Sequence, residues 1–358
     1  MNRSLTAILA LALLPCSSAF AQEGPGSLAK RPPSAAASSR AITLDVAVTD
    51  KSGAPIRGLQ ANDFTLLDDK HPQPITSFYV VTSHPPSPSD PPVQVVLLVD
   101  NVNIGQQTVA FERNQIRQYL LQNGGELPHP VSLIVFTDYG TQVQRTPSQD
   151  GKALATEYDQ YQTGLRSINR SQGFYGAAER FDLSLKTLTS IIAYEKQQPG
   201  RKLLIWISPG WPLLTGPAVE LTTKQEEQIF RSIVNYSTSL RDARITLYNV
   251  DPLGLADAAT TRITYYQEFL KGVTSPSRVD AADLSLQVLS VQSGGAVYNS
   301  TNDLATSIAK CVSDAASYYV LTFDAAPTDR PDEYHSLQVK VEQHGAIVRT
   351  RTGYYAQP

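Results

Sequence analysis

The chain has 358 residues, a formal net charge of −3 and a hydrophobic content of 41%, values that are ordinary for a globular protein. It contains no basic block, so the charge pattern excludes the cationic footprint that binding to duplex nucleic acid requires. The length accommodates two domains, or one domain that carries a large insertion.

Residues 1–21 have the pattern of a secretory signal peptide. Arg3 supplies the positive start, residues 5–14 form a short apolar run, and the end at Ala21 matches a small-x-small cleavage site. We therefore expect cleavage near Ala21 and an exported chain, periplasmic or extracellular. A retained anchor is the alternative, but the run is shorter than the roughly 18 apolar residues that span a bilayer. No other stretch approaches that length, so no membrane span is expected.

Removal of the signal leaves Cys311 as the only cysteine. It shares helical spacing with Leu304, Ile308 and Ala315, and no histidine stands nearby to lower the pKa of its thiol. This pattern predicts a buried core thiol rather than a nucleophile.

The next segments change in character along the chain. Residues 22–40 are rich in Pro, Ser and Ala and are expected to form a flexible leader. Residues 41–82 alternate apolar and polar positions between turn residues, as β-strands do. About 40 residues are too few to close a stable sandwich, so these strands need a partner. Residues 83–92 contain five prolines and are expected to form an extended linker.

Residues 93–316 alternate between buried strands and amphipathic helices. Residues 93–100 and 202–207 are almost continuously apolar, as in strands that are covered on both faces. The clearest helix covers 174–194, where apolar residues recur every three or four positions. This alternation predicts an α/β domain with a doubly wound, mainly parallel sheet.

Residues 317–358 return to alternating strands, separated by Pro, Asp and Gly turns. The simplest arrangement pairs them with the strands of 41–82, so that both chain ends build a small β-sandwich. The α/β domain of 93–316 would then be inserted into this sandwich.

With these elements placed, the chain resembles the bacterial, acidobacterial-type VWFA-related domain proteins. The stretches that carry the resemblance occur in family order: VAVTDKSGAPIRGLQANDFTLLDD, VVLLVDNVN, LLIWISPGWP, LYNVDPLGL, SGGAVYNSTNDLATSIAKCVSDAASYYVLTF and RTGYY. The resemblance covers nearly the whole mature chain and implies a von Willebrand factor A fold, a β-rich flank and export. It implies no particular substrate.

Von Willebrand A domains often bind a divalent cation in a metal-ion-dependent adhesion site. That site begins with Asp-x-Ser-x-Ser after the first strand, and a second and a third loop add a Thr and an Asp. Asp100 matches the first Asp, whereas Val102 and Ile104 stand at the two Ser positions and cannot coordinate. The third loop corresponds to residues 208–210, where Pro209 stands at the Asp position. The resemblance therefore implies a degenerate site.

A few oxygen donors remain near the degenerate site. Ser167 or Ser171 could substitute for the Thr of the second loop. Asp100, Asn103 and Ser208 are the candidate metal ligands, for Mg²⁺ or Ca²⁺, because both ions prefer oxygen ligands. The opposing interpretation is that Asp100 and Asn103 satisfy backbone donors where the strand turns into a helix, which predicts no cofactor.

Other chemistry has little support in the sequence. The five histidines lack metal-ligand spacing, and three stand next to prolines in expected turns or loops: His71, His84 and His129. The Asp-Asp-Lys residues 68–70 are expected in a turn rather than as a glycosidase pair. Ser208 does not lie in a G-x-S-x-G motif, and Pro209 lacks the N–H that an oxyanion hole would use. No nucleotide-binding motif is present.

Four aromatic residues stand near the expected binding edge. Trp206 is expected in the core, whereas Trp211 is expected to cover the degenerate site or to meet a partner. Tyr265 and Tyr266 suit a protein interface, since tyrosine is enriched there, or they pack a helix on the sheet.

We predict an exported, non-enzymatic interaction or adhesion module. It would bind a protein or an envelope component through loops at the C-terminal edge of the sheet. The candidate contact residues are Asp100, Asn101, Asn103, Ser208, Trp211 and Asp251. The alternatives are a divalent-cation-dependent adhesion receptor with a relaxed site around Asp100 and, more distantly, an envelope hydrolase.

Overall fold

A computed structural model describes residues 40–83, 91, 93–144, 146–161, 174–214, 220–254, 262–328 and 330–357. Ser38–Pro358 form one compact unit. The expected signal peptide, nearly all of the leader and most of the linker lie outside the described residues, as do Ser167, Ser171 and His84.

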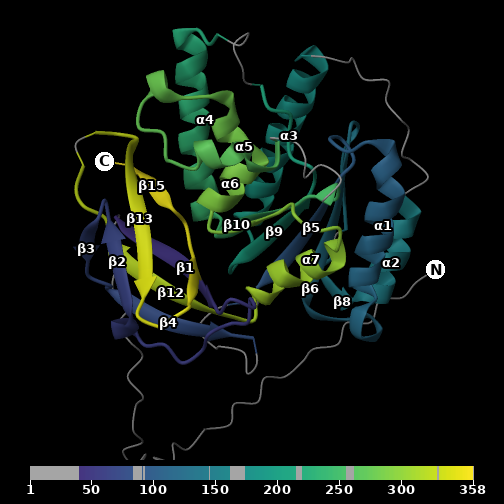
Figure 1. Cartoon of the computed structure of the whole chain (residues 1–358), viewed down its shortest axis with the longest axis horizontal. Coiled ribbons are helices and arrows are strands. Elements are labelled where there is room, and N and C mark those ends of the chain that lie inside the picture. Colours follow the sequence, from purple (N-terminus) through teal and green to yellow (C-terminus); the bar gives the residue numbers. More distant parts are fainter. Residues whose placement is uncertain are drawn as a thin grey trace, which may run out of the picture. The chain divides into compact units, whose positions relative to one another are not determined.

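A mainly parallel, seven-stranded sheet lies at the centre of this unit (Figure 1). Its strand order is β11-β10-β9-β5-β6-β7, and β8 pairs with β6. Pairing is parallel among β5, β6, β9, β10 and β11, and antiparallel for β7 and β8. The bounds are β5 (Gln94–Asp100), β6 (Glu126–Thr137), β7 (Gly140–Val143), β8 (Ser148–Asp150), β9 (Lys202–Ile207), β10 (Ile245–Val250) and β11 (Val297–Tyr298).

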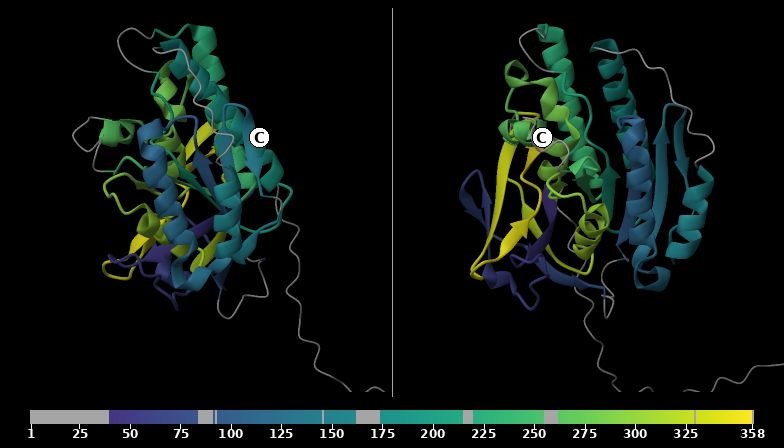
Figure 2. Two further views of the ribbon diagram at one scale, coloured as in Figure 1. Left: turned by 90° about the vertical axis from the view of Figure 1, so that its right-hand side faces the viewer. Right: turned by 45° about the vertical axis from the view of Figure 1, so that its right-hand side comes forward.

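Helices cover both faces of the central sheet. Successive side chains of a strand point to opposite faces, and because these strands are apolar at almost every position, both faces must be buried. Leu97 packs in the cluster that contains side chains of α1 (Gln106–Leu120), α2 (Gly151–Gln160) and α7 (Leu304–Ser313). Leu98 packs in the opposite cluster, with side chains of α3 (Phe174–Glu195), α4 (Thr223–Asp242) and α6 (Leu286–Gln292). The expected doubly wound arrangement is therefore present, and Figure 2 shows the helical layers from two further sides.

The chain changes direction across this sheet between β5 and β9. From β5 it adds β6 and β7 on one side, and it then returns to add β9, β10 and β11 on the other. The carboxyl ends of β5 and β9 therefore diverge into loops at a topological switch point, which is where open α/β sheets bind ligands. Asp100 ends β5 and Ser208 directly follows β9.

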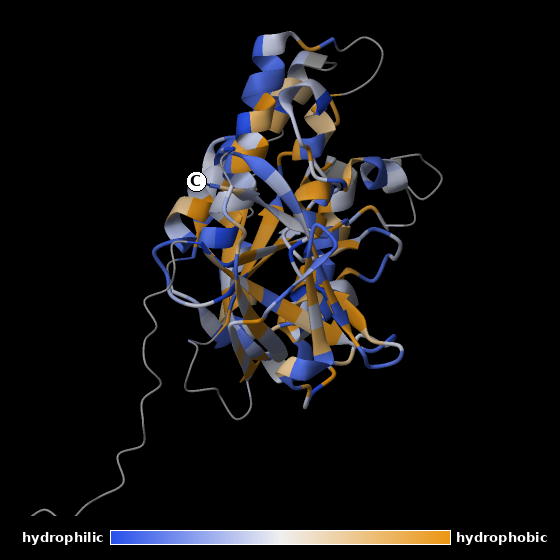
Figure 3. Ribbon diagram, turned by 90° about the vertical axis from the view of Figure 1, so that its left-hand side faces the viewer, coloured by the Kyte–Doolittle hydropathy of each residue, from blue (hydrophilic) through white to orange (hydrophobic). Residues whose placement is uncertain are grey.

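Strands from both chain ends build two four-stranded antiparallel sheets. The first, in the order β14-β1-β12-β4, contains β1 (Ala41–Thr49), β4 (Ser77–Thr82), β12 (Ser317–Asp324) and β14 (Ile347–Arg349). The second, in the order β15-β13-β2-β3, contains β2 (Phe64–Asp68), β3 (His71–Gln73), β13 (Glu333–Val341) and β15 (Gly353–Ala356). Apolar side chains from both sheets meet in one core cluster. Figure 3, which is coloured by hydropathy, shows that hydrophobic residues gather in the strands.

The remaining elements of the described residues are short. They are the helix α5 (Arg262–Tyr265) and the 3-10 turns η1 (Ala61–Asp63), η2 (Gln122–Gly125), η5 (Tyr266–Phe269), η6 (Pro276–Arg278) and η7 (Ala281–Leu284). Within the described part of the chain, no helix is long and apolar enough to cross a bilayer. The expectation of a turn at His129 is wrong, because this residue lies inside β6 and is buried.

Candidate functional site

Asp100 is the centre of the hydrogen-bond network at the switch point. Its side chain is buried, and Oδ1 accepts hydrogen bonds from the backbone N–H groups of Val102, at 2.9 Å, and Asn103, at 3.0 Å. Oδ2 accepts from Asn103 Nδ2 at 2.8 Å, Trp206 Nε1 at 3.0 Å and Ser208 Oγ at 2.9 Å. These donors saturate a carboxylate, which offers about four lone-pair positions.

This geometry does not fit the octahedral cation site that the family resemblance suggests. Mg²⁺ and Ca²⁺ need oxygen lone pairs directed at the ion. The lone pairs of Asp100 point at N–H and O–H donors, and Val102, Ile104 and Pro209 add hydrocarbon where ligands would stand. Among the three candidate ligands, Asn103 has a side-chain oxygen, Oδ1, with no hydrogen-bond partner among the described residues.

A second buried carboxyl group, Glu112 of α1, interacts electrostatically with Asp100. Glu112 is completely buried, and neither of its carboxyl oxygens has a hydrogen-bond partner among the described residues. Burial, together with the charge of Asp100, raises the pKa of Glu112 well above its ordinary value. Burial also raises the pKa of Asp100, but its hydrogen-bond donors oppose that shift. We therefore assign the negative charge to Asp100 and a neutral carboxylic acid to Glu112.

The loop after β9 is held tightly against the strand ends. Ser208 Oγ donates to Asp100 and accepts from the N–H of Gly210 at 3.1 Å, and Asn249 Nδ2 donates to the Ser208 carbonyl at 2.8 Å. Gly210 has a φ of 96°, in the left-handed region, and a Cβ there would collide with the side chain of Gln287. A glycine at this position therefore lets the loop pass close to α6.

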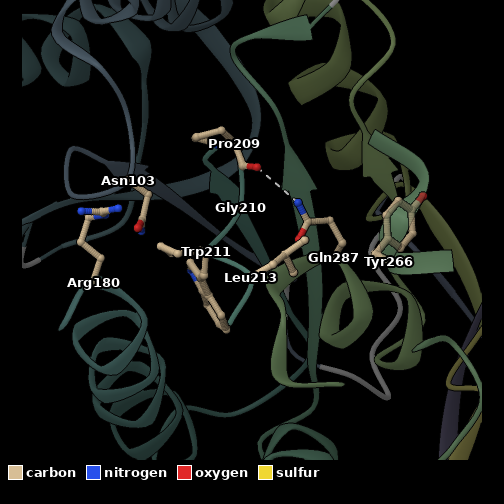
Figure 4. Close-up of a pocket in the computed structure, with 9 residues that line it drawn as sticks. Asn103, Arg180, Pro209, Gly210, Trp211, Leu213, Tyr266 and Gln287 are labelled. Atoms are coloured by element: carbon tan, nitrogen blue, oxygen red, sulfur yellow. Dashed lines mark hydrogen bonds between the residues drawn. The ribbon is translucent and has the colours of Figure 1, made fainter. Parts of the chain in front are cut away.

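A cavity of about 260 Å³ opens beside this loop, and we call it the switch-point pocket (Figure 4). Arg180 of α3 and Asn103 lie on one side, and Tyr266 of η5 and Gln287 of α6 lie on the other. Gln287 Nε2 donates to the Pro209 carbonyl at 3.3 Å. The complete described lining is Asn103, Arg180, Pro209, Gly210, Trp211, Pro212, Leu213, Tyr266 and Gln287.

Two tryptophans support the base of this pocket. Trp206 is completely buried, as expected, and its ring centroid lies 5.2 Å from that of Trp211 in an edge-to-face arrangement. Phe181 packs against Trp211 from α3 in a similar way, at 6.5 Å. Trp211 is only 3% exposed, yet its indole Nε1 has no hydrogen-bond acceptor among the described residues. A buried N–H without an acceptor is unfavourable.

The structure brings some of the predicted contact residues together and separates others. Asp100, Asn103, Ser208 and Trp211 belong to one network or line one pocket. Asn101 contributes its backbone N–H to the Phe136 carbonyl, and its side chain does not line the pocket. Asp251 directly follows β10 and accepts from the N–H of Leu253 at 2.9 Å, outside the pocket lining.

Sequence reasoning missed several residues of this region, among them Glu112, Arg180 and Gln287. Arg180 had a usable signal, because a helix that connects parallel strands runs antiparallel to them. The first turns of the helix predicted at 174–194 must therefore lie at the carboxyl edge of the sheet. Glu112 and Gln287 stand within short amphipathic stretches and had no comparable signal.

A separate polar cluster lies in the antiparallel sheets. His335 Nδ1 lies 3.1 Å from Asp68 Oδ1 and 3.3 Å from Asp69 Oδ2, and the Tyr354 hydroxyl donates to Asp68 Oδ2 at 2.7 Å. The expectation of a simple turn at residues 68–70 is thus correct only in part, because Asp68 ends β2 and is buried. The cluster joins β2, β13 and β15 and takes no part in the switch-point pocket.

The comparisons with known proteins give weak similarities. No family model matches the chain, and no curated protein matches it. The pilus adhesin SpaC from Lactobacillus rhamnosus GG matches 83% of this chain and 49% of its own, at 10% identity and a TM-score of 0.36. The human COPII-coat protein Sec24c matches 78% of this chain and 46% of its own, at 8% identity and a TM-score of 0.33.

The VWA domain of SpRpn10 is a further, weak structural neighbour. It matches 45% of this chain and 74% of its own, at 16% identity and a TM-score of 0.19. This chain spans about half the length of the Sec24c and SpaC chains that it matches. The resemblance to a bacterial VWFA-related family stays a prediction.

Proposed function

We propose that this protein is a non-enzymatic interaction module of von Willebrand A type that contacts another protein through the switch-point pocket. One observation carries the proposal: the pocket lies at the switch point of the central sheet and is lined by the polar side chains of Asn103, Arg180 and Gln287 beside apolar ones. A few convergent polar groups in an apolar surround are what binding sites generally offer.

The residues of the pocket favour binding over catalysis. The described lining contains no Asp, Glu, His, Cys or Ser side chain that could act as a general base or a nucleophile. Ser208 lies beneath it, completely buried, and its hydroxyl donates to Asp100 rather than to a histidine. We propose on this ground that the envelope-hydrolase alternative is the weaker one.

A cation-dependent adhesion receptor is the second candidate, and one observation favours it. Asn103 Oδ1 is a buried oxygen that has no hydrogen-bond partner in the part of the chain that the structure describes, and Mg²⁺ and Ca²⁺ bind oxygen ligands. Calorimetric titration with Mg²⁺, Ca²⁺ and Mn²⁺ separates the two candidates. Heat of binding that disappears in Asn103→Ala would support the receptor, whereas the main proposal expects no binding heat.

Export is the third part of the proposal, and it rests on residues 1–21, which lie outside the described residues. We expect the chain that is recovered from the producing cell envelope to begin near Gln22. Amino-terminal sequencing of that chain tests this, and an intact Met1 would contradict it.

Site-specific photocrosslinking tests the interaction itself. A photoreactive phenylalanine derivative at Tyr266, which lines the pocket, should yield a discrete adduct with a partner protein in envelope extract. The matched control places the same group at Tyr194, which is 55% exposed in the last turn of α3, at the far end of that helix from Arg180. Equal adducts from both positions, or none from Tyr266, would contradict an interaction through this pocket.

A further inference from the structure

We propose that a second cavity, at the opposite edge of the central sheet from the switch-point pocket, binds a phosphate group through clustered arginines. An outer cavity of about 390 Å³ and an inner chamber of about 20 Å³ share Thr43, Arg241 and Arg244 as lining residues, so they are parts of one hollow, which we call the arginine pocket. None of its described lining residues belongs to the switch-point pocket, so the inference does not depend on the proposed function.

The fold brings four arginines from distant sequence positions to this hollow. Arg241 lies in the last turn of α4, and Arg244 directly precedes β10, which places it at the amino edge of the central sheet. Arg40 precedes β1 and lines the outer cavity, whereas Arg351 lies between β14 and β15 and lines the inner chamber. The arginine pocket therefore joins the central sheet to the antiparallel sheets.

The first argument is an excess of positive charge. The described lining holds four arginines and only two carboxylates, Asp45 and Asp242. Asp45 pairs with Arg244 at 2.6 Å. Asp242 lies 3.6 Å from Arg241 and is shared with Lys196, which is 3.4 Å away. Four arginines and two carboxylates leave two positive charges over, and a phosphate monoester supplies about two negative charges near neutral pH.

The second argument is a buried guanidinium that lacks a counter-charge. Arg351 is 8% exposed, and its Nη1 donates to the Ser237 carbonyl at 3.2 Å. No ion pair among the described residues includes it. Burial, together with the positive charge of Arg241, lowers the pKa of Arg351 to about 10. A buried charge is costly unless it is paired, and an anion in the hollow that both arginines line would pair it.

The third argument is the shape of the hollow. The inner chamber has room for about one water-sized group, such as a single phosphate oxygen directed at Arg351. Arg241 and Arg244 line both spaces and can hold further oxygens, because guanidinium groups bind phosphate in a bidentate way. The outer cavity lies within the roughly 300–1,000 Å³ of ligand pockets, so it accommodates an organic group attached to the phosphate.

Other groups at the hollow do not oppose an anion. The carbonyl end of a helix carries a partial negative charge, but the Ala243 carbonyl at the end of α4 accepts from the buried Lys202 Nζ at 3.1 Å. The hydroxyl groups of Tyr354 and Tyr355 already donate to Asp68 and to the Val273 carbonyl. Recognition of the phosphate therefore falls to the arginines.

Calorimetric titration of the full chain tests the site. The probes are inorganic phosphate and glycerol 3-phosphate, with acetate as the carboxylate control, and sodium gluconate holds the ionic strength constant. We expect saturable binding of one phosphate group per chain and weaker binding of acetate. Tighter binding of glycerol 3-phosphate would identify a phosphate on a larger molecule as the ligand, and tighter binding of inorganic phosphate would identify the free ion; either result supports the site.

Matched variants separate a ligand site from a structural role. Arg241→Gln should weaken phosphate binding about tenfold or more, and Arg40→Gln, at an exposed position, should weaken it less. Arg231→Gln removes the same charge from an exposed position of α4 and should bind as the parent does. Without phosphate, Arg241→Gln should unfold at the same temperature as the parent or higher, since it relieves the repulsion on Arg351. Saturating phosphate should then raise the unfolding temperature of the parent but not of Arg241→Gln.

Four results would overturn the inference. They are no saturable binding of either phosphate probe, equal binding in Arg241→Gln and the parent, equal binding of acetate, and an equal rise in unfolding temperature in both proteins. The last result would indicate the general stabilising effect of phosphate salts rather than a site. Photocrosslinking at Tyr266 reports on the other pocket, so failure here would leave the proposed function standing.

Discussion

At the scale of single residues, the interior holds a carboxyl group that the fold does not satisfy. Glu112 is buried without a hydrogen-bond partner among the described residues, and its pKa is raised well above the ordinary value by burial and by Asp100. The folded state therefore retains a proton that the unfolded chain releases above its ordinary pKa. Stability consequently falls as the pH rises from about 4.5 toward the raised folded value.

We expect Glu112→Met to stabilise the protein by about 1–3 kcal/mol near pH 8, because it removes an unsatisfied buried polar group. The gain should shrink toward pH 4, where the carboxyl is protonated in both states. Urea unfolding at pH 4, 6 and 8 measures this, with Glu342→Gln as a control at an exposed glutamate. A Glu112→Met variant that is destabilised by the same amount at every pH would indicate a packing role instead.

Asp283 gives a second pH effect, with a defined window. Burial raises its pKa from 3.8 to about 6, against the hydrogen bond that its carboxylate accepts from the N–H of Asp280 at 2.7 Å. The folded state again binds the proton more tightly than the unfolded chain does. The free energy of unfolding therefore falls as the pH rises from about 4 to about 6, and it stays constant above that pH. Asp283→Asn keeps an acceptor for Asp280 and should flatten this window, with a gain of about 1–3 kcal/mol at pH 7. Parallel pH profiles of the two proteins would contradict the assignment.

At the scale of elements, the sequence pattern predicts the central sheet well and the pocket only in part. Continuous apolar runs identify β5 and β9, and their parallel pairing places Asp100 and Ser208 at one edge. Pairings that depend on strand register cannot be predicted in this way. Asp68 and His335 meet across 267 positions only because β2 and β13 are neighbours in a sheet.

The loop after β9 has a backbone requirement that a substitution can test. Gly210→Ala would place an alanine at an unfavourable positive φ. Its new Cβ would also collide with the side chain of Gln287. We expect a loss of about 1–3 kcal/mol in urea unfolding, larger than for Gly345→Ala, where φ is also positive but nothing crowds the Cβ. Adding Gln287→Ala should recover part of the loss. Equal losses for the two alanine variants, with no recovery, would exclude crowding by Gln287.

At the scale of the whole Ser38–Pro358 unit, the central sheet and the antiparallel sheets share their core and their polar contacts. Val81 of β4 and Tyr318 and Val320 of β12 belong to the same apolar cluster as the residues of β5, α1 and α7. The guanidinium of Arg201 lies 4.5 Å from the ring centroid of Tyr318. Elements with a common core unfold together, so independent domains are not expected here.

Asp314 is the polar residue through which this coupling can be tested. It is 1% exposed, accepts from the Tyr248 hydroxyl of β10 at 2.6 Å, and pairs with Arg349 of β14. Asp314→Ala leaves the Arg349 charge without its partner, so we expect a loss of about 3–5 kcal/mol.

Asp314 contacts both the central sheet and an antiparallel sheet. Asp314→Ala should therefore lower the unfolding temperature of the whole unit, which should still unfold in a single transition. Differential scanning calorimetry measures it, and the calorimetric enthalpy should equal the van't Hoff enthalpy in both the parent protein and the variant. The matched control, Asp182→Ala, breaks an exposed ion pair with Lys186 and should change stability by less than about 1 kcal/mol. Two separate endotherms in the parent protein would show that the sheets are independent folding units. The Asp314→Ala substitution would then destabilise only one of them.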